Sequence, residues 1–181
     1  MAEIAQRRGP LVFERSWLRP VEPAARFILR GAADVMTAAA TVFGVTPSST
    51  ACRAAVQGDR AALWLGPDEQ LLIAPVTEAD SIGAALERAL AGLPHSVVDV
   101  SHRQVALHVA GAQAEAILAG YCPLDLDLRA FPVGTCTRTV YSKAEIVLWR
   151  TERKVFQVEV WRSFTDYVVR LMSEVAAELG A

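Results

Sequence analysis

Stretches in which apolar and polar positions alternate are interspersed with apolar stripes at helical spacing, which is the pattern of an α+β fold. Alternation predicts strands at residues 26–30, 53–57, 60–65, 70–74, 96–100, 104–110, 135–141, 144–150 and 154–161. Apolar residues at helical spacing predict helices at residues 34–43, 78–91 and 112–119, and a last helix that begins at residue 163. The sequence therefore predicts helices packed on largely antiparallel sheet.

End signals support these helices. Gly44 follows the first one at the position where a left-handed residue commonly ends a helix. Asp34 is expected to cap that helix, and Ser163 with Asp166 resembles a capping box for the last. The last helix is expected to bury a single stripe, formed by Phe164, Tyr167, Val168, Leu171, Val175 and Leu179.

The order of elements repeats once along the chain. Each half reads strand, helix, three strands and helix, and a glycine, Gly31 or Gly111, follows the first strand. Residues 61–65 align with residues 145–149. We interpret this as an internal duplication; a chance similarity between two ordinary α+β pieces is the alternative.

The duplication and the prolines predict a short arm and a single domain. Residues 1–23 are rich in proline, which discourages both helix and paired strand, so they form an arm that crosses a surface. The apolar anchors of this arm dock either on its own domain or on another chain. Residues 24–181 are expected to form one domain made of two half-repeats, about 24–93 and 94–181.

Composition narrows the class of protein. Among 181 residues, 52% are hydrophobic and 21% are charged, which is enough for a packed core. A net charge of −2 gives no basic face for nucleic acid. No apolar run approaches the roughly 18–20 residues of a membrane span, and the first ten residues lack the apolar core of a signal peptide. We therefore expect a cytoplasmic protein that binds neither nucleic acid nor membrane.

Few residues suggest chemistry. A metal site built from His102, His108 and Cys122 stays open, although surface or core-edge histidines fit the spacing better and no zinc motif is present. Asp99, Ser101 and His102 bring an acid, a hydroxyl and an imidazole close in sequence. On an extended strand, however, Asp99 and Ser101 point to one face and His102 to the other. A turn at the end of that strand is the simpler interpretation.

The glycines and cysteines point the same way. Gly31 and Gly111 are lone glycines between a strand and a helix and match no phosphate-binding loop. Cys52, Cys122 and Cys136 are widely spaced and fit small buried side chains in a reducing compartment. We predict no catalytic, cofactor-binding or metal-binding residue in this chain.

Tryptophan and arginine suggest a partner interface. Trp149 with Arg150 and Trp161 with Arg162 place an indole beside a guanidinium near the ends of two strands, and both residue types are common interface anchors. The same tryptophans also fit a core under the last helix. With Trp17 from the arm, these four residues form the candidate interface.

The second half resembles a known family. The run Val98-Asp99-Val100-Ser101-His102-Arg103 and the later Gly111 are similar to a strand of the glycine-cleavage T-protein (aminomethyltransferase-like) superfamily. Residues 120–126, 131–139, 143–150 and 161–167 resemble the gamma subunit of heterotetrameric sarcosine oxidase. The resemblance covers most of residues 60–178 and almost none of residues 1–50.

The resemblance implies a fold related to the folate-binding T-protein domain. It also implies a non-catalytic gamma-type subunit, with a structural or assembly role, of a complex that oxidatively demethylates sarcosine or a related secondary amine. Partner subunits of alpha, beta and delta type would hold FAD, FMN, NAD and tetrahydrofolate, and this chain would hold no cofactor. Expressed alone, it is expected to be a homo-oligomer. A stand-alone folate- or small-ligand-binding module of one-carbon metabolism, an independent enzyme and an unrelated α+β protein are the alternatives.

Overall fold

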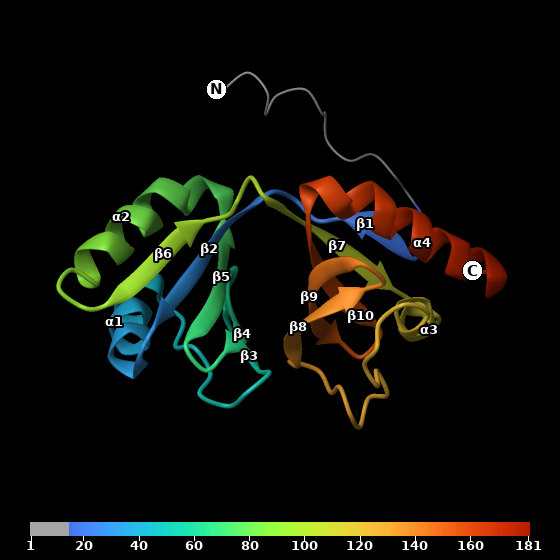
Figure 1. The fold of residues 1–181 in the computed structure, drawn as a ribbon, viewed down its shortest axis with the longest axis horizontal. Coiled ribbons are helices and arrows are strands. Elements are labelled where there is room, and N and C mark those ends of the chain that lie inside the picture. Colours follow the sequence, from blue (N-terminus) through green and yellow to red (C-terminus); the bar gives the residue numbers. More distant parts are fainter. Residues whose placement is uncertain (1–14) are drawn as a thin grey trace, which may run out of the picture.

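The computed structural model describes residues 15–181 (Figure 1). The strands are β1 (Leu18–Pro20), β2 (Ala24–Gly31), β3 (Ala54–Gln57), β4 (Arg60–Gly66), β5 (Glu69–Pro75), β6 (His95–Asp99), β7 (Gln104–Ala110), β8 (Cys136–Tyr141), β9 (Ala144–Glu152) and β10 (Val155–Trp161). The helices are α1 (Ala33–Phe43), α2 (Ala79–Ala89), α3 (Ala114–Ala119) and α4 (Thr165–Glu178), with 3₁₀ turns η1 (Val76–Glu78) and η2 (Arg162–Phe164). Each strand and helix predicted from the sequence is present, so the predicted α+β class is confirmed. Within residues 15–181, no helix is long and apolar enough to span a membrane.

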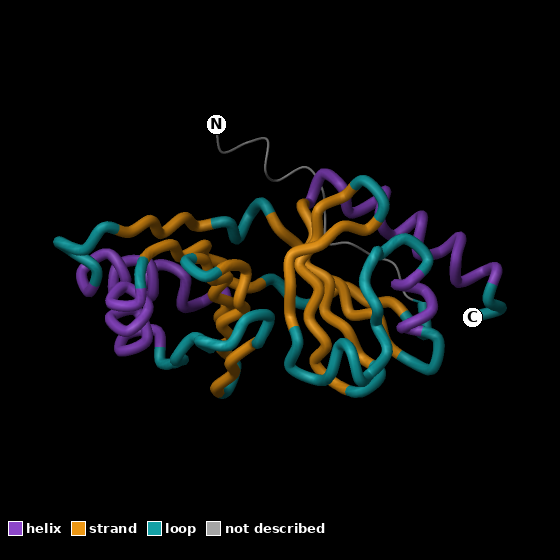
Figure 2. Tube along the Cα trace, turned by 60° about the horizontal axis from the view of Figure 1, so that its bottom comes forward, coloured by secondary structure: helices purple, strands orange, loops and turns teal. Residues whose placement is uncertain are grey.

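The strands form two antiparallel sheets with the same internal order. One sheet runs β6-β2-β5-β4-β3 and the other runs β1-β7-β10-β9-β8. Helices α1 and α2 cover the outer face of the first sheet, and α3 and α4 cover the outer face of the second (Figures 1 and 2). One core lies between each sheet and its helices, and a third apolar cluster lies between the inner faces of the two sheets. We call the two units the first half and the second half.

The halves exchange their edge strands. β1 precedes β2 in the chain but pairs with β7 of the second half, and β6 precedes β7 but pairs with β2 of the first half. An edge strand tolerates Pro20, because its outer side needs no backbone donor. The described part of the predicted arm therefore docks on its own domain, where Trp17 and Leu18 are buried in the second core. The rest of the arm, residues 1–14, lies outside the described residues. The half-repeat boundaries at 24–93 and 94–181 stay a prediction.

Matching backbone contacts fix how the halves correspond. The N–H of Gly31 donates to the carbonyl of Asp68, and the N–H of Gly111 donates to that of Lys154. Two residues beyond each carbonyl, Gln70 pairs across the sheet with Trp64, and Phe156 pairs with Arg150. Trp64 therefore corresponds to Arg150, and the alignment of residues 61–65 with 145–149 is wrong by two positions. The shift is even, so it preserves which side chains face the helices.

The ends of the helices match the sequence only in part. Gly44 has a φ of 79° and ends α1 as predicted. The predicted caps are wrong: the residue that caps α1 is Ala32, and the one that caps α4 is Phe164, in neither case with a side-chain hydrogen bond. Asp34 lies in the first turn of α1, where its Oδ1 accepts from the N–H of Val35.

The predicted stripe of α4 is correct only in part. The residues that α4 buries are Thr165, Val168, Met172 and Ala176. Val168 belongs to the predicted stripe and Leu171 packs partly buried against the same core, whereas Phe164, Tyr167 and Leu179 are exposed. Met172 and Ala176 lie one position along the chain from Leu171 and Val175 of the predicted stripe, so the buried face is rotated relative to the predicted one. An apolar face of α4, with Phe164 and Tyr167, is therefore left exposed by residues 15–181.

Candidate functional site

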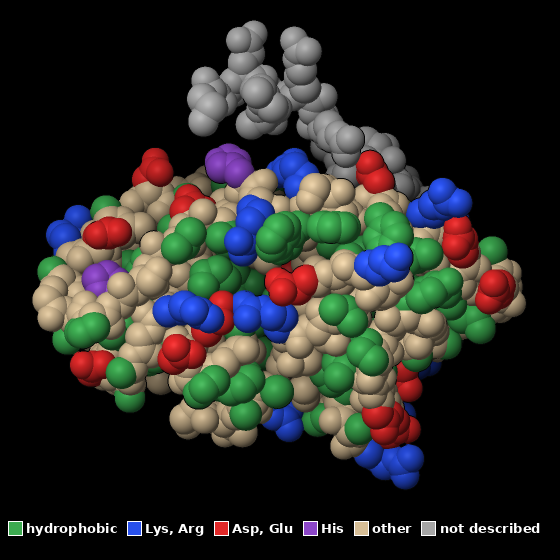
Figure 3. All heavy atoms as spheres, in the orientation of Figure 1, with side chains coloured by type: hydrophobic (Ala, Val, Ile, Leu, Met, Phe, Trp, Pro, Cys, Tyr) green, Lys and Arg blue, Asp and Glu red, His purple; other side chains and the backbone are tan. Residues whose placement is uncertain are grey.

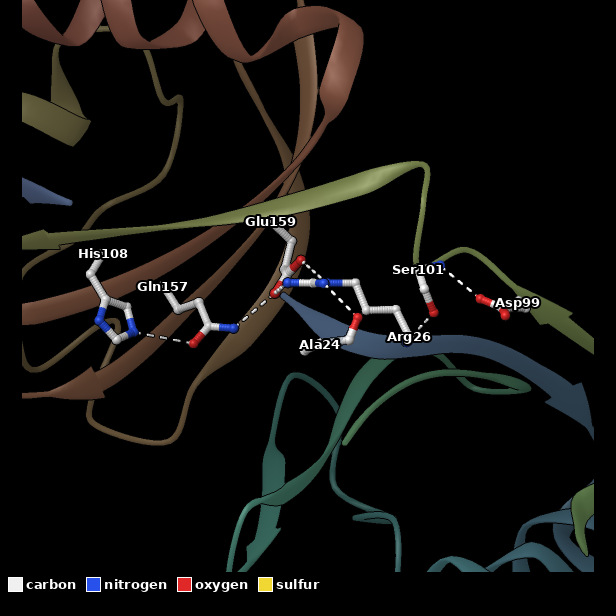
Figure 4. A network of polar contacts seen from close by, with 7 residues as sticks. All are labelled: Ala24, Arg26, Asp99, Ser101, His108, Gln157 and Glu159. Atoms are coloured by element: carbon white, nitrogen blue, oxygen red, sulfur yellow. Dashed lines mark hydrogen bonds and ion pairs between the residues drawn. The ribbon is translucent and has the colours of Figure 1, made fainter. Parts of the chain in front are cut away.

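A buried ion pair joins the inner faces of the two sheets (Figure 4). Arg26 on β2 donates through Nε to Glu159 Oε2 on β10 at 2.6 Å and through a terminal nitrogen to Oε1 at 3.3 Å. The side chains are 2% and 0% exposed. Since a buried charge is stable only with its partner, this pair links the halves.

Further polar side chains of the second half extend this network. Gln157 Nε2 donates to Glu159 Oε1 at 2.8 Å, and Gln157 Oε1 lies 3.3 Å from His108 Nε2. Burial lowers the pKa of His108, and the nearby Arg19 lowers it further, despite the bond to Gln157. The neutral imidazole is therefore the favoured form. Figure 4 shows these residues as one chain of contacts between the sheets.

A second carboxylate crosses the interface in the opposite direction. Glu69 on β5 accepts from Arg138 on β8 at 2.5 Å and from Arg30 on β2 at 2.7 Å. Burial raises the pKa of Glu69, but hydrogen bonds from Arg138 and Arg30 outweigh it, so the pKa lies below its usual value. Each half thus supplies an arginine to a buried carboxylate of the other half.

The acid, hydroxyl and imidazole near residue 100 form a turn, as predicted. Asp99 Oδ1 accepts from the N–H of Ser101 at 2.8 Å, and Ser101 Oγ accepts from the N–H of Arg26 at 2.9 Å. The carbonyl of His102 accepts from Arg162 Nε at 3.1 Å. The hydroxyl serves the junction between the halves, and this geometry does not activate it as a nucleophile.

The metal set left open by the sequence is not assembled. Among residues 15–181, no group of three or more His, Cys, Asp and Glu side chains is placed to hold a metal ion. Cys122 and Cys136 are buried. Burial raises the pKa of both thiols, that of Cys136 to about 12, so both favour the unreactive protonated form.

The βα turns do not fit a dinucleotide. Phosphate binding at such a turn uses free backbone N–H groups, but those of Gly31 and Gly111 donate to Asp68 and Lys154. A Cβ on Gly31 would lie 2.6 Å from Val35, so glycine is needed there for close packing of α1. These glycines therefore have a structural explanation.

The candidate interface residues are spread over different environments. Trp17 and Arg150 are buried inside the second half. Trp149 is partly buried and packs against the cluster between the sheets. Trp161 and Arg162 are exposed and adjacent, so of the five candidates only these two offer a substantial surface to a partner.

Arg150 organises the second half from within. It donates to Glu115 Oε2 at 2.9 Å, to the carbonyl of Arg153 at 3.1 Å and to the carbonyl of Leu126, and its guanidinium lies 4.4 Å from the ring centre of Phe156. This arginine holds a loop, a turn and a helix against the sheet.

The uncovered face of α4 is part of an aromatic surface, which we define as Tyr121, Trp161, Phe164 and Tyr167. Their side chains are 41%, 36%, 40% and 36% exposed. Tyr167 donates to Ser142 Oγ at 3.0 Å, and the N–H of Ser142 donates to the carbonyl of Tyr121 at 2.9 Å. Figure 3 shows hydrophobic side chains gathered over the start of α4, with basic side chains beside them. Phe164 and Tyr167 were missed because their helical spacing predicted burial.

The comparisons with known proteins identify the family. Residues 30–178 match the model of the "Sarcosine oxidase, gamma subunit family". The chain belongs to this family. A gamma-subunit relative, sarcosine oxidase subunit gamma of Corynebacterium sp. (strain P-1), is 38% identical over 122 residues, which are 65% of this chain and 59% of the relative. The match thus spans less than two thirds of that relative's length.

Solved structures extend the gamma-subunit match to three dimensions. A chain of the heterotetrameric sarcosine oxidase from Corynebacterium sp. U-96, solved with pyrrole 2-carboxylate, superposes with a TM-score of 0.84 at 30% identity, over 91% of this chain and 85% of that one. The glycine cleavage system aminomethyltransferase T from Bartonella henselae superposes with a TM-score of 0.64 at 13% identity, over 86% of this chain and 44% of that one. The second match shows the fold alone. The predicted T-protein-like fold of this gamma-family chain is therefore confirmed.

Proposed function

We propose that this chain is a gamma-type subunit with a structural role in a sarcosine oxidase-like assembly. The observation that carries the proposal is the TM-score of 0.84 with a chain of a heterotetrameric sarcosine oxidase. The assembly would oxidatively demethylate sarcosine or a related secondary amine in the cytoplasm, and this chain would complete and stiffen it.

In this proposal, the partner subunits of the assembly carry out its chemistry. We propose alpha, beta and delta-type subunits as the partners and place FAD, FMN, NAD and tetrahydrofolate in them. Two observations support an accessory role. The N–H groups of Gly31 and Gly111 are bonded within the fold, and burial keeps the thiol of Cys136 protonated.

The aromatic surface is the proposed contact with a partner subunit. Aromatic side chains bury a large area at low entropic cost and are enriched among the residues that carry binding energy. Trp161 also holds Arg103 at 4.9 Å above its ring, and Arg162 lies next to it. Such a surface fits an apolar patch with acidic residues at its rim. Of the predicted interface residues, Trp161 and Arg162 are therefore retained in the proposal.

Co-expression with alpha, beta and delta-type sarcosine oxidase subunits tests the proposal. We expect this chain to co-elute with them in size-exclusion chromatography, with a mass from light scattering that fits one copy per complex. If the folded chain elutes separately while its partners assemble without it, the proposal is wrong.

Substitution within the aromatic surface sharpens this test. Phe164→Ser with Tyr167→Ala should weaken association at least about tenfold, because truncation of two central aromatic anchors removes about 2 kcal/mol or more. Leu179→Ser is the matched control, since Leu179 is equally exposed but lies beyond the far end of α4. Without partners, the exposed aromatic side chains should promote self-association, which Phe164→Ser should reduce.

A further inference from the structure

The first half contains a neutral cavity beside its first helix. It has a volume of about 580 Å³. Its walls come from α1, residues 46–51, β4 and β5, and include Met36, Pro47, Trp64 and Gln70. None of its lining side chains is charged. A mostly apolar cavity of this size, with a few polar groups, is typical of sites for small molecules.

Gln70 is a residue of this wall whose side-chain acceptor lacks a partner. The residue is 3% exposed, and its Oε1, itself buried, accepts no hydrogen bond within residues 15–181, so a ligand reaches it when the carboxamide turns toward the cavity. Two hydroxyls in the wall are already engaged: Thr37 donates to the carbonyl of Ala33, and Ser48 donates to that of Thr50. A buried acceptor without a donor is unfavourable, and a ligand that brings a donor removes that cost.

Trp64 supplies the second element of the site. It is the cross-strand partner of Gln70, so an indole lies beside the carboxamide in the same wall. A flat ring stacked on an indole is a favourable arrangement, and the terminal torsion of a glutamine is soft enough to follow a ligand. Together the two side chains suit a ring that also carries a hydrogen-bond donor.

The second half shows that the fold does not require this arrangement. The corresponding space there measures about 420 Å³ and is lined by five charged residues, among them Arg150, Glu115 and Lys154. Arg150 replaces Trp64, and Phe156 replaces the polar Gln70. The corresponding space of the second half is therefore neither neutral nor lined by an unpartnered glutamine.

We infer that the cavity bounded by Trp64 and Gln70 binds a neutral, planar nitrogen heterocycle that donates an N–H to Gln70 Oε1. Neutrality follows from the absence of charged lining residues, since a buried ion would have no counter-charge. Planarity follows from Trp64, and the N–H donor from the unpartnered acceptor. This site goes beyond the proposed function and does not rest on it, because the inference is argued from lining residues of this chain.

Two probes of similar shape test the inference. Indole carries an N–H donor, whereas benzofuran has an ether oxygen in its place. Ligand-observed NMR titration of the full chain should show indole binding about tenfold more tightly than benzofuran, because benzofuran leaves Gln70 Oε1 without a donor. Failure of indole to bind up to its solubility limit, or equal binding of both probes, would overturn the inference.

Variants locate the effect. Gln70→Leu should abolish the preference for indole, and Trp64→Leu should lower the affinity for both probes. Gln57→Leu is the matched control, because Gln57 lies exposed on β3 outside the cavity, and it should keep the wild-type preference. Circular dichroism confirms that each variant is folded. A preference for indole that persists in folded Gln70→Leu contradicts the assignment of Oε1 as the acceptor.

Discussion

The two halves have the same order of strands and helices but use the space beside their first helix differently. In the second half, Arg150 crosses that space and binds Glu115 and two backbone carbonyls. In the first half, Trp64 occupies the corresponding strand position and Gln70 keeps an acceptor without a partner. The second half therefore has a charged network at the position where the first half has a neutral cavity.

The comparison distinguishes residues that both halves share, and that the fold requires, from residues that are particular to one half. Both halves keep a glycine between the first strand and the first helix, and both keep an apolar sheet face under their helices. The polar residues beside the first helix differ, with Arg150 bonded to Glu115 in one half and Gln70 without a partner for Oε1 in the other. At the interface the halves act reciprocally, through Arg26 with Glu159 and Arg138 with Glu69.

The largest expected effect comes from breaking the link between the halves. Glu159→Leu leaves Arg26 buried without its counter-charge and should lower the free energy of unfolding by about 3–5 kcal/mol, measured by urea denaturation. Adding Arg26→Met should restore most of that loss, because an apolar pair of similar volume removes both desolvated charges. If the double variant is no more stable than Glu159→Leu, the two side chains do not act as a pair.

Removal of the arginine that is specific to the second half should have a somewhat smaller effect. Arg150→Met leaves the carbonyls of Leu126 and Arg153 without their side-chain donor, and we expect a loss of about 2–3 kcal/mol. Arg129→Met is the control, since Arg129 pairs with Asp127 at an exposed site where solvent screens the pair, so its loss should change stability much less. Equal effects of the two variants would contradict the central role of Arg150.

The pH dependence tests the interface from both sides. The pKa of His108 lies below its ordinary value of 6.5, so stability should begin to fall as the pH drops below about 6.5 and the unfolded chain takes up the proton first. The pKa of Glu69 lies below its ordinary 4.5, so a second loss should follow below about pH 4.5. His108→Gln should remove the first step and Glu69→Gln the second, in denaturation midpoints measured from pH 8 to pH 3.

The sequence predicted the elements well because alternation and helical spacing are local signals. It did not predict that the halves exchange β1 and β6. Each of these strands pairs with a strand far away in the sequence, β1 with β7 and β6 with β2, and such pairings leave no local pattern. It also assigned Phe164 and Tyr167 to a buried stripe, because spacing alone does not tell which apolar face of α4 meets the sheet. The pairings of Arg26 with Glu159 and of Arg138 with Glu69 join residues far apart in the chain and carry no local pattern.

The smallest effect has the most informative sign. Gln70→Leu replaces an acceptor that has no partner by an apolar side chain of similar size, so it should leave stability unchanged or raise it by up to about 1 kcal/mol. Gln57→Leu, at an exposed position, should change it by less than about 0.5 kcal/mol. A loss of more than about 1 kcal/mol for Gln70→Leu would mean that the carboxamide already stabilises the fold. A gain would mean that the first half keeps an unfavourable polar group, which is the expected cost of a binding site, whereas the second half has Arg150 and Phe156 at the corresponding positions.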